Sequence, residues 1–136
     1  IIIHFNTLSF EEGDKATKEL LKMSDPPDGI FSSNDTAAVS AIMCAKKMGV
    51  DVPRDLAIIG FNDDPIASIV HPSLSTVSHP AKKMGIISAR RIIEHSNQDY
   101  DTDLSEITVL GTDIIDRDSS LKNITILDSP KSNYSS

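Results

Sequence analysis

The sequence has one cysteine and no tryptophan, and only 4% of its residues are aromatic. Because Cys44 has no second cysteine to pair with, a secreted scaffold held by internal disulfides is excluded. No apolar run approaches the ~18 residues that a membrane-spanning helix needs. Basic residues are also few: 13 Lys and Arg stand against 20 Asp and Glu, for a net charge of −7. That balance argues against a nucleic-acid-binding module and against a polybasic membrane anchor.

The length of 136 residues suits about one domain with a real hydrophobic core. The chain begins with Ile1-Ile2-Ile3-His4-Phe5, without a Met and without the basic region of a signal peptide. This opening is typical of the inside of a β-strand. We therefore expect a fragment of a longer, cytoplasmic protein, the alternative being an ordinary N-terminal strand after Met removal.

Strand-like and helical patterns alternate along the chain. The predicted strands are 1–5, 29–32, 56–61, 74–77, 107–110 and 113–116, and the predicted helices are 10–23, 35–48, 65–70 and 79–95. Strands that alternate with helices form βαβ units. The expected fold class is α/β, a parallel sheet with helices on both faces in three αβα layers. The continuous apolar run 56–61 predicts a strand buried on both faces.

Local signals mark where several helices begin and end. Ser9 and Glu12 have the spacing of a capping box, in which Glu12 reaches back to the Ser9 amide. Asn34 is a good N-cap, Gly49 suits the left-handed end of the same helix, and Asp64 can cap a short helix that starts at Pro65.

Two polar clusters follow neighbouring strands, Ser33-Asn34-Asp35 after the first and Asn62-Asp63-Asp64 after the second. Ligands of open α/β sheets bind beyond the carboxyl ends of the strands. Helix capping alone also explains Asn34 and Asp35. The second cluster suits recognition of polyol hydroxyls, or Mg²⁺ held by Asp63 and Asp64.

The sequence gives little support to a nucleotide-binding, catalytic or metal site of another kind. The sequence contains neither a Gly-rich phosphate loop nor a dinucleotide fingerprint. Cys44 lies within a predicted helix and is expected to be a small core residue rather than a nucleophile. The four histidines lack metal-ligand spacing, so we expect no metal, no cofactor and no enzymatic activity.

Several motifs resemble one family in order and spacing. They are 27–35 (PDGIFSSND), 49–63 (GVDVPRDLAIIGFND), 72–77 (PSLSTV), 80–85 (PAKKMG) and 115–119 (IDRDS). Together they resemble the effector-binding domain of LacI/GalR transcription regulators, over roughly residues 10–119. The resemblance implies a periplasmic-binding-protein-like fold with two lobes, of which this chain looks like the last part. Residues 1–120 would form mainly the C-terminal lobe, 79–95 would cross to the N-terminal lobe, and 121–136 would be a weakly ordered tail.

The resemblance also implies a ligand site in the cleft between the lobes. It carries over to Asn34, Asp35, Asn62, Asp63 and His79. Asn62 stands where the family commonly has an aspartate, and an uncharged amide that both donates and accepts disfavours a cationic effector. A neutral sugar or a phosphosugar remains open.

The helix that starts at Asn34 is apolar on most of its circumference. This fits the dimer surface that the resemblance implies for this helix and the segment 66–74. The expected residues of this surface are Ala38, Val39, Ile42, Ile69, Val70 and His71. The alternative is a helix buried within one domain.

The expected function is the ligand-sensing and dimerisation segment of a LacI-type regulator, whose N-terminal helix-turn-helix lies outside this chain and binds the operator DNA. A sugar-binding protein of a transporter shares the fold and is the first alternative. A small Mg²⁺-dependent α/β enzyme that uses Asp63 and Asp64 is the second.

Overall fold

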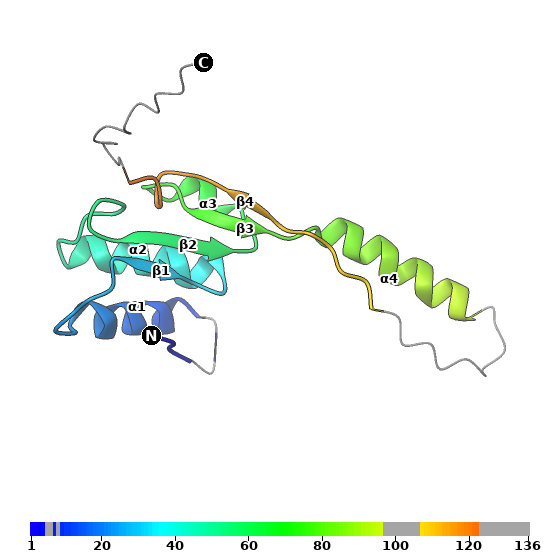
Figure 1. The fold of residues 1–136 in the computed structure, drawn as a ribbon, viewed down its shortest axis with the longest axis horizontal. Coiled ribbons are helices and arrows are strands. Elements are labelled where there is room, and N and C mark those ends of the chain that lie inside the picture. Colours follow the sequence, from blue (N-terminus) through cyan, green and yellow to red (C-terminus); the bar gives the residue numbers. More distant parts are fainter. Residues whose placement is uncertain (5–6, 8, 97–106, 123–136) are drawn as a thin grey trace, which may run out of the picture.

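The computed structural model describes residues 1–4, 7, 9–96 and 107–122, which form one sheet and four helices (Figure 1). The elements are α1 (Phe10–Leu21), β1 (Gly29–Phe31), α2 (Asp35–Lys47), β2 (Ala57–Phe61), α3 (Ile66–Ile69), β3 (Ser75–Ser78), α4 (Ala81–Ser96) and β4 (Asp113–Ile115). The predicted α/β class is confirmed. None of the described helices is long and apolar enough to cross a membrane.

The sheet is mixed, with strand order β1-β2-β3-β4. β1 pairs with β2 and β2 with β3 in parallel, whereas β4 runs antiparallel to β3. The antiparallel pair arises because β3 leads the chain away from the sheet towards α4, and β4 brings it back (Figure 1). The carboxyl ends of the parallel strands β1, β2 and β3 lie at the same edge of the sheet. The predicted polar clusters begin at this edge.

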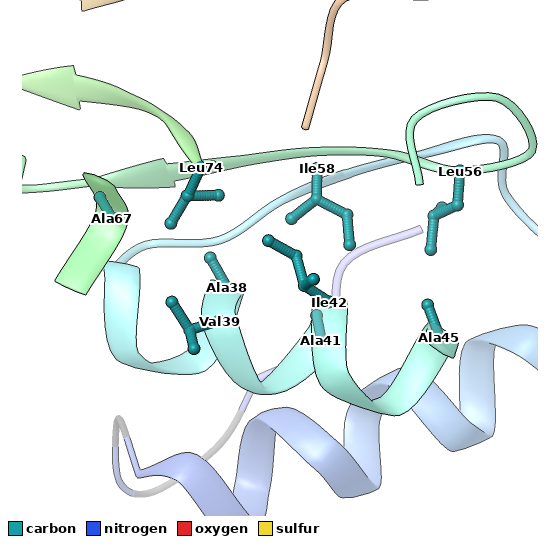
Figure 2. Close-up of a cluster of buried hydrophobic side chains, with 9 residues drawn as sticks. All are labelled: Ala38, Val39, Ala41, Ile42, Ala45, Leu56, Ile58, Ala67 and Leu74. Carbon is teal, nitrogen blue, oxygen red and sulfur yellow. The ribbon is translucent and has the colours of Figure 1, made fainter. Parts of the chain in front are cut away.

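The hydrophobic core lies between α2 and one face of the sheet (Figure 2). Leu56, Ile58 and Leu74 contribute from the sheet side, and α3 adds Ala67. The residues of α2 in this core are Ala38, Val39, Ala41, Ile42 and Ala45, all at most 3% exposed. Small residues on α2 let the helix lie close to the sheet, which gives dense packing without large side chains.

The second apolar side of α2 is covered by α1 of the same chain. A Cβ on Gly13 would lie 2.7 Å from the Ala37 carbonyl oxygen, so glycine permits this close approach. The Ser40 hydroxyl donates to the Phe10 carbonyl at 2.5 Å, which pairs a polar atom inside the contact. The alternative of a helix buried within one domain therefore describes α2.

This packing buries three residues of the expected dimer surface. Ala38, Val39 and Ile42 are core residues of the chain itself and leave almost no surface for a second molecule. Ile69 is 79% exposed on α3, and His71 beside it is also exposed. Only the α3 end of the expected surface is therefore accessible.

The sheet buries its two faces unequally. Along β2, Ile58 and Gly60 are buried, whereas Ala57, Ile59 and Phe61 are only partly covered. The prediction that 56–61 is buried on both faces is therefore wrong for the described residues. α2 lies against the side of Ile58, and the opposite face includes Phe31, which is 64% exposed.

Two expected strands are absent from the described residues. Residues 1–4 have no regular structure, and Phe5 lies outside the described part. Residues 107–110 are also irregular, with Ile107 and Val109 almost fully exposed. β-Branched composition predicted both strands, but a strand forms only where a neighbour supplies its hydrogen bonds.

The caps agree in part with the prediction. Ser9 accepts from the Glu12 amide at 3.3 Å, but the Glu12 carboxylate reaches Thr7 rather than the Ser9 amide. Gly49 has the predicted positive φ of 77°. Pro65 is the N-cap of α3, which has no side-chain cap, so Asp64 does not play the predicted role. Of the predicted tail 121–136, residues 123–136 lie outside the described part.

α4 projects from the end of the sheet and has no buried residue (Figure 1). Its large apolar side chains are exposed, with Ile92 at 70% and Ile93 at 63%. The predicted helix 79–95 is confirmed within two residues at its start. Its exposed apolar side chains make no buried contact with the rest of the described chain.

Gly60 provides a test of the packing between β2 and α2. A Cβ there would lie 2.1 Å from Asp35 Oδ1 and 3.0 Å from a Leu74 methyl carbon, so Gly60→Ala should lower the free energy of unfolding by about 1–3 kcal/mol. Urea denaturation measures the loss. Gly85→Ala on α4 is the control, since nothing lies within 4 Å of its Cβ and no destabilisation is expected. Equal stability of the two variants would contradict the packing.

Candidate functional site

Three of the expected ligand residues lie beyond the carboxyl ends of adjacent parallel strands. Asn34 follows β1, Asn62 follows β2 and His79 follows β3. The backbone also links the ends of β2 and β3, because the Asn62 amide donates to the Val77 carbonyl at 3.0 Å. The arrangement that the strand order predicted is therefore present.

Asn34 holds the start of α2. Its Oδ1 accepts from the Ala37 amide at 2.7 Å, and its carbonyl accepts from the Ser32 hydroxyl at 2.9 Å. The residue is 8% exposed. The capping interpretation is confirmed, and the cap also fixes the Asn34 side chain at the edge of the sheet.

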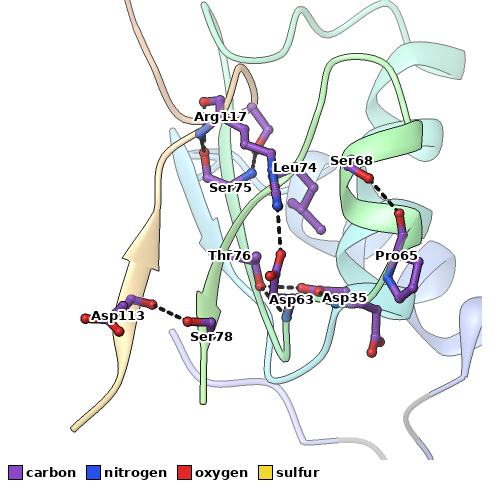
Figure 3. Close-up of polar contacts among 12 residues, drawn as sticks. Asp35, Asp63, Pro65, Ser68, Leu74, Ser75, Thr76, Ser78, Asp113 and Arg117 are labelled. Atoms are coloured by element: carbon purple, nitrogen blue, oxygen red, sulfur yellow. Dashed lines mark hydrogen bonds and ion pairs between the residues drawn. The ribbon is translucent and has the colours of Figure 1, made fainter. Parts of the chain in front are cut away.

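Asp35 is buried inside the protein, where its side chain lies against Thr76 and the turn that follows β2 (Figure 3). The residue has no exposed surface, and its two carboxylate oxygens have different partners. Oδ1 accepts from the Thr76 hydroxyl at 2.7 Å, and Oδ2 accepts from the Asp64 amide at 2.7 Å. A buried carboxylate needs such donors. Its contacts join the start of α2 to β3 and to the turn after β2.

The turn Asn62–Asp64 has an unusual backbone. Asn62 has a φ of 121° and Asp63 a φ of 58°. Non-glycine residues in this region cost of order 1–3 kcal/mol each unless the surroundings hold them. Besides the Asn62 amide, the Asp63 amide donates to Thr76 Oγ1 at 3.3 Å and the Asp64 amide to Asp35. Every amide of the turn is thus bound by β3 or α2.

The Asp63 carboxylate is paired with Arg117. Arg117 Nη2 lies 2.7 Å from Asp63 Oδ1, and Nη1 donates to the Leu74 carbonyl at 2.8 Å (Figure 3). The side chains are 20% and 33% exposed. The Asp63 carboxylate is therefore bound by another segment of the protein, as the Asp35 carboxylate is.

Sequence reasoning missed Thr76, Arg117 and Phe61 as parts of this site. Thr76 and Arg117 lie inside the motifs 72–77 and 115–119 that carry the family resemblance. The motifs could therefore have pointed to these two residues, but no role was assigned to either. Phe61 stacks on His79 with ring centroids 5.7 Å apart and an interplanar angle of 4°. His79 Nδ1 is buried and has no hydrogen-bond partner among the described residues. The stack fixes the imidazole at the end of β3.

Two acidic side chains of this region are engaged within the protein. Across the described ranges, no group of three or more His, Cys, Asp or Glu side chains could hold a metal ion. The Asp35 and Asp63 carboxylates are engaged by Thr76, Asp64 and Arg117 instead. Cys44 is buried as predicted, its thiol donates to the Asp14 carbonyl, and burial raises its pKa, with the Asp14 carboxylate adding to the effect.

A family comparison matches almost the whole described chain. The model of the periplasmic binding protein-like domain matches residues 3–120. The chain belongs to this family. Within it, the similar proteins are LacI-type repressors, and the chain is a LacI/GalR-type effector-binding domain segment.

Individual relatives agree with this membership. The lactose operon repressor of Rhizobium radiobacter is 33% identical over 113 residues, which are 82% of this chain and 96% of that protein. The ribose operon repressor of Halalkalibacterium halodurans is 39% identical over 62% of this chain, but this chain covers only 25% of its length. A solved complex of the transcriptional regulator CelR with cellobiose has a TM-score of 0.72 and 26% identity, covering 83% of this chain and 34% of that one.

The Cys44 thiol yields a prediction about reactivity. Because its raised pKa leaves less thiolate at pH 8 and the side chain is buried, native labelling by iodoacetamide should be more than about 100-fold slower than in urea. A Ser68→Cys, Cys44→Ala double variant is the control, since Ser68 is exposed on α3 and should react rapidly. Native labelling of Cys44 as fast as that of the control would show that α1 does not cover it.

Proposed function

We propose that this chain is the ligand-sensing and dimerisation segment of a LacI-type transcription regulator. In this proposal residues 1–120 form part of the effector-binding domain, and residues 79–95 pack in a second lobe. DNA binding belongs to a helix-turn-helix outside the chain, the regulator works in the cytoplasm, and no bond is made or broken.

One observation carries the proposal. Asn34, Asn62 and His79 lie at the ends of three adjacent parallel strands. The protein itself holds the Asn34 side chain through the Ala37 amide, the Asn62 backbone through Val77 and the His79 ring through Phe61. Polar groups that are fixed before a ligand arrives are what hydroxyl recognition needs, because little ordering remains to be done on binding. The repressor names of the relatives support the same reading.

The effector we propose is a neutral sugar. The Asn34 and Asn62 amides can donate to and accept from hydroxyl groups. The cellobiose complex of the similar regulator supports this ligand class. A phosphosugar is the variant to compare, because Lys82 and Lys83 line a depression next to His79. Asp35 and Asp63, which we expected to bind the ligand, are assigned instead to holding the Asn62 turn.

The proposed mechanism is a shift between arrangements of two lobes. A sugar bound to this edge and to a facing lobe favours the arrangement that it fits better. α4 carries exposed apolar side chains suited to packing in that lobe, so the strands that lead to it would move with the lobe.

A second copy of the chain is the proposed dimer partner. Ile69, Ile66 and Met43 are 79%, 44% and 41% exposed on α3 and the neighbouring part of α2. Of the expected dimer residues, Ile69, Val70 and His71 are accessible, and Ile66 and Met43 are added to them in this proposal. Exposed apolar groups of this kind support an interface.

Asn62→Ala tests the ligand site. Removing an amide that pairs with a buried hydroxyl should cost about 1–3 kcal/mol of binding free energy. Calorimetry of the complete regulator with cellobiose, lactose, ribose and glucose 6-phosphate measures the difference for whichever sugar binds.

Ser68→Ala is the control, because the exposed Ser68 hydroxyl donates to the carbonyl of Pro65, the N-cap of α3. Its affinity should equal that of the wild type. Equal affinity of Asn62→Ala and the wild type would remove Asn62 from the site. Mg²⁺-dependent phosphatase activity lost in Asp63→Ala would overturn the proposal as a whole.

A further inference from the structure

Arg117 joins two parts of the chain that are far apart in sequence. Its guanidinium binds the Asp63 carboxylate through Nη2 and the Leu74 carbonyl through Nη1, at 2.7 and 2.8 Å. Two donors of one planar group are thus used on two different segments, which fixes the side chain in one orientation. The side chain is only 20% exposed, so solvent weakens this ion pair less than it weakens a surface pair.

The backbone of Arg117 is fixed to β3. The Arg117 amide donates to Ser75 Oγ at 2.8 Å, and the Ser75 hydroxyl donates to the Arg117 carbonyl at 2.9 Å. Arg117 comes two residues after β4, the strand that returns from α4 and pairs with β3. Its position is therefore tied to the two strands that connect the sheet to α4 (Figure 3).

The other partner of the ion pair, Asp63, lies in the strained Asn62–Asp64 turn. Asp63, with a φ of 58°, follows Asn62, with a φ of 121°. Because this conformation persists only while its surroundings hold it, loss of one anchor should let the turn relax. Arg117 is the anchor that comes from beyond α4, whereas Asp35 and Thr76 come from α2 and β3.

We infer that Arg117 is a positioning residue that couples the Asn62–Asp64 turn to the β3–β4 strand pair. A displacement of these strands shifts the turn through the contact between Arg117 and Asp63. A change in the conformation of the turn shifts the strands through the same contact. Such coupling is reciprocal. That the turn meets a ligand rests on the proposed function, but the coupling between turn and strands does not.

Site-resolved amide hydrogen exchange on this chain tests the coupling without a ligand. In Arg117→Gln, exchange of the Asn62, Asp63 and Asp64 amides should accelerate about tenfold, while the amides of α2 keep their rates. In Asp63→Asn the amides of β4 should also accelerate, although Asp63 lies on the far side of β3. Because both substitutions break the Arg117–Asp63 ion pair, the turn amides of the double variant should exchange no faster than those of Arg117→Gln.

Two further variants serve as controls for this experiment. Arg54→Gln removes an arginine that is 75% exposed and pairs with Asp51 and Asp55, and it should leave the turn unchanged. Arg117→Lys keeps the charge but cannot make both contacts, so its turn amides should exchange at intermediate rates even if Arg117→Gln fails to fold.

Unchanged turn amides in Arg117→Gln, or equal acceleration of turn and α2 amides, would overturn the inference. Failure of every sugar to bind the wild-type regulator would instead count against the proposed function and leave the exchange result standing.

Discussion

The Asp35 carboxylate is the contact on which the rest of the site depends. It is fully buried, and it joins the start of α2 to the Thr76 hydroxyl on β3 and to the Asp64 amide after β2. Gly60 leaves the space for it, since any side chain there would occupy the position of Oδ1. A buried charge is costly unless its donors are complete, so these three segments are held together by the need to satisfy one group.

The position of Asn62 follows from this arrangement. With Asp64 held by Asp35, Asp63 by Arg117 and the Asn62 amide by Val77, the turn keeps a backbone that its residues would not adopt alone. The Asp35 and Asp63 carboxylates at this edge are thus bound by other parts of the protein. Both carboxylates therefore already have partners within the protein, although the cluster is rich in aspartate.

Much of this could be predicted from the sequence. The cap at Asn34 and the strands β1 to β3 come from local patterns, and the family motifs put Asn34, Asn62 and His79 at one edge. Local patterns could not show that α1 would cover α2, because that contact depends on Gly13 meeting Ala37 across the fold. The inward direction of Asp35 was equally hidden, since its partner Thr76 is 41 residues away. Residues 107–110 failed as a strand because β propensity does not supply a neighbour to pair with.

The most direct measurement is a double-mutant cycle between Asp35 and Thr76. Asp35→Asn, Thr76→Val and the double variant would be unfolded in urea, and the coupling free energy taken from the cycle. If the buried carboxylate joins the segments as described, the coupling should be about 1–3 kcal/mol. Free energies that add to within about 0.5 kcal/mol would show that the two residues do not act together, and would contradict the account.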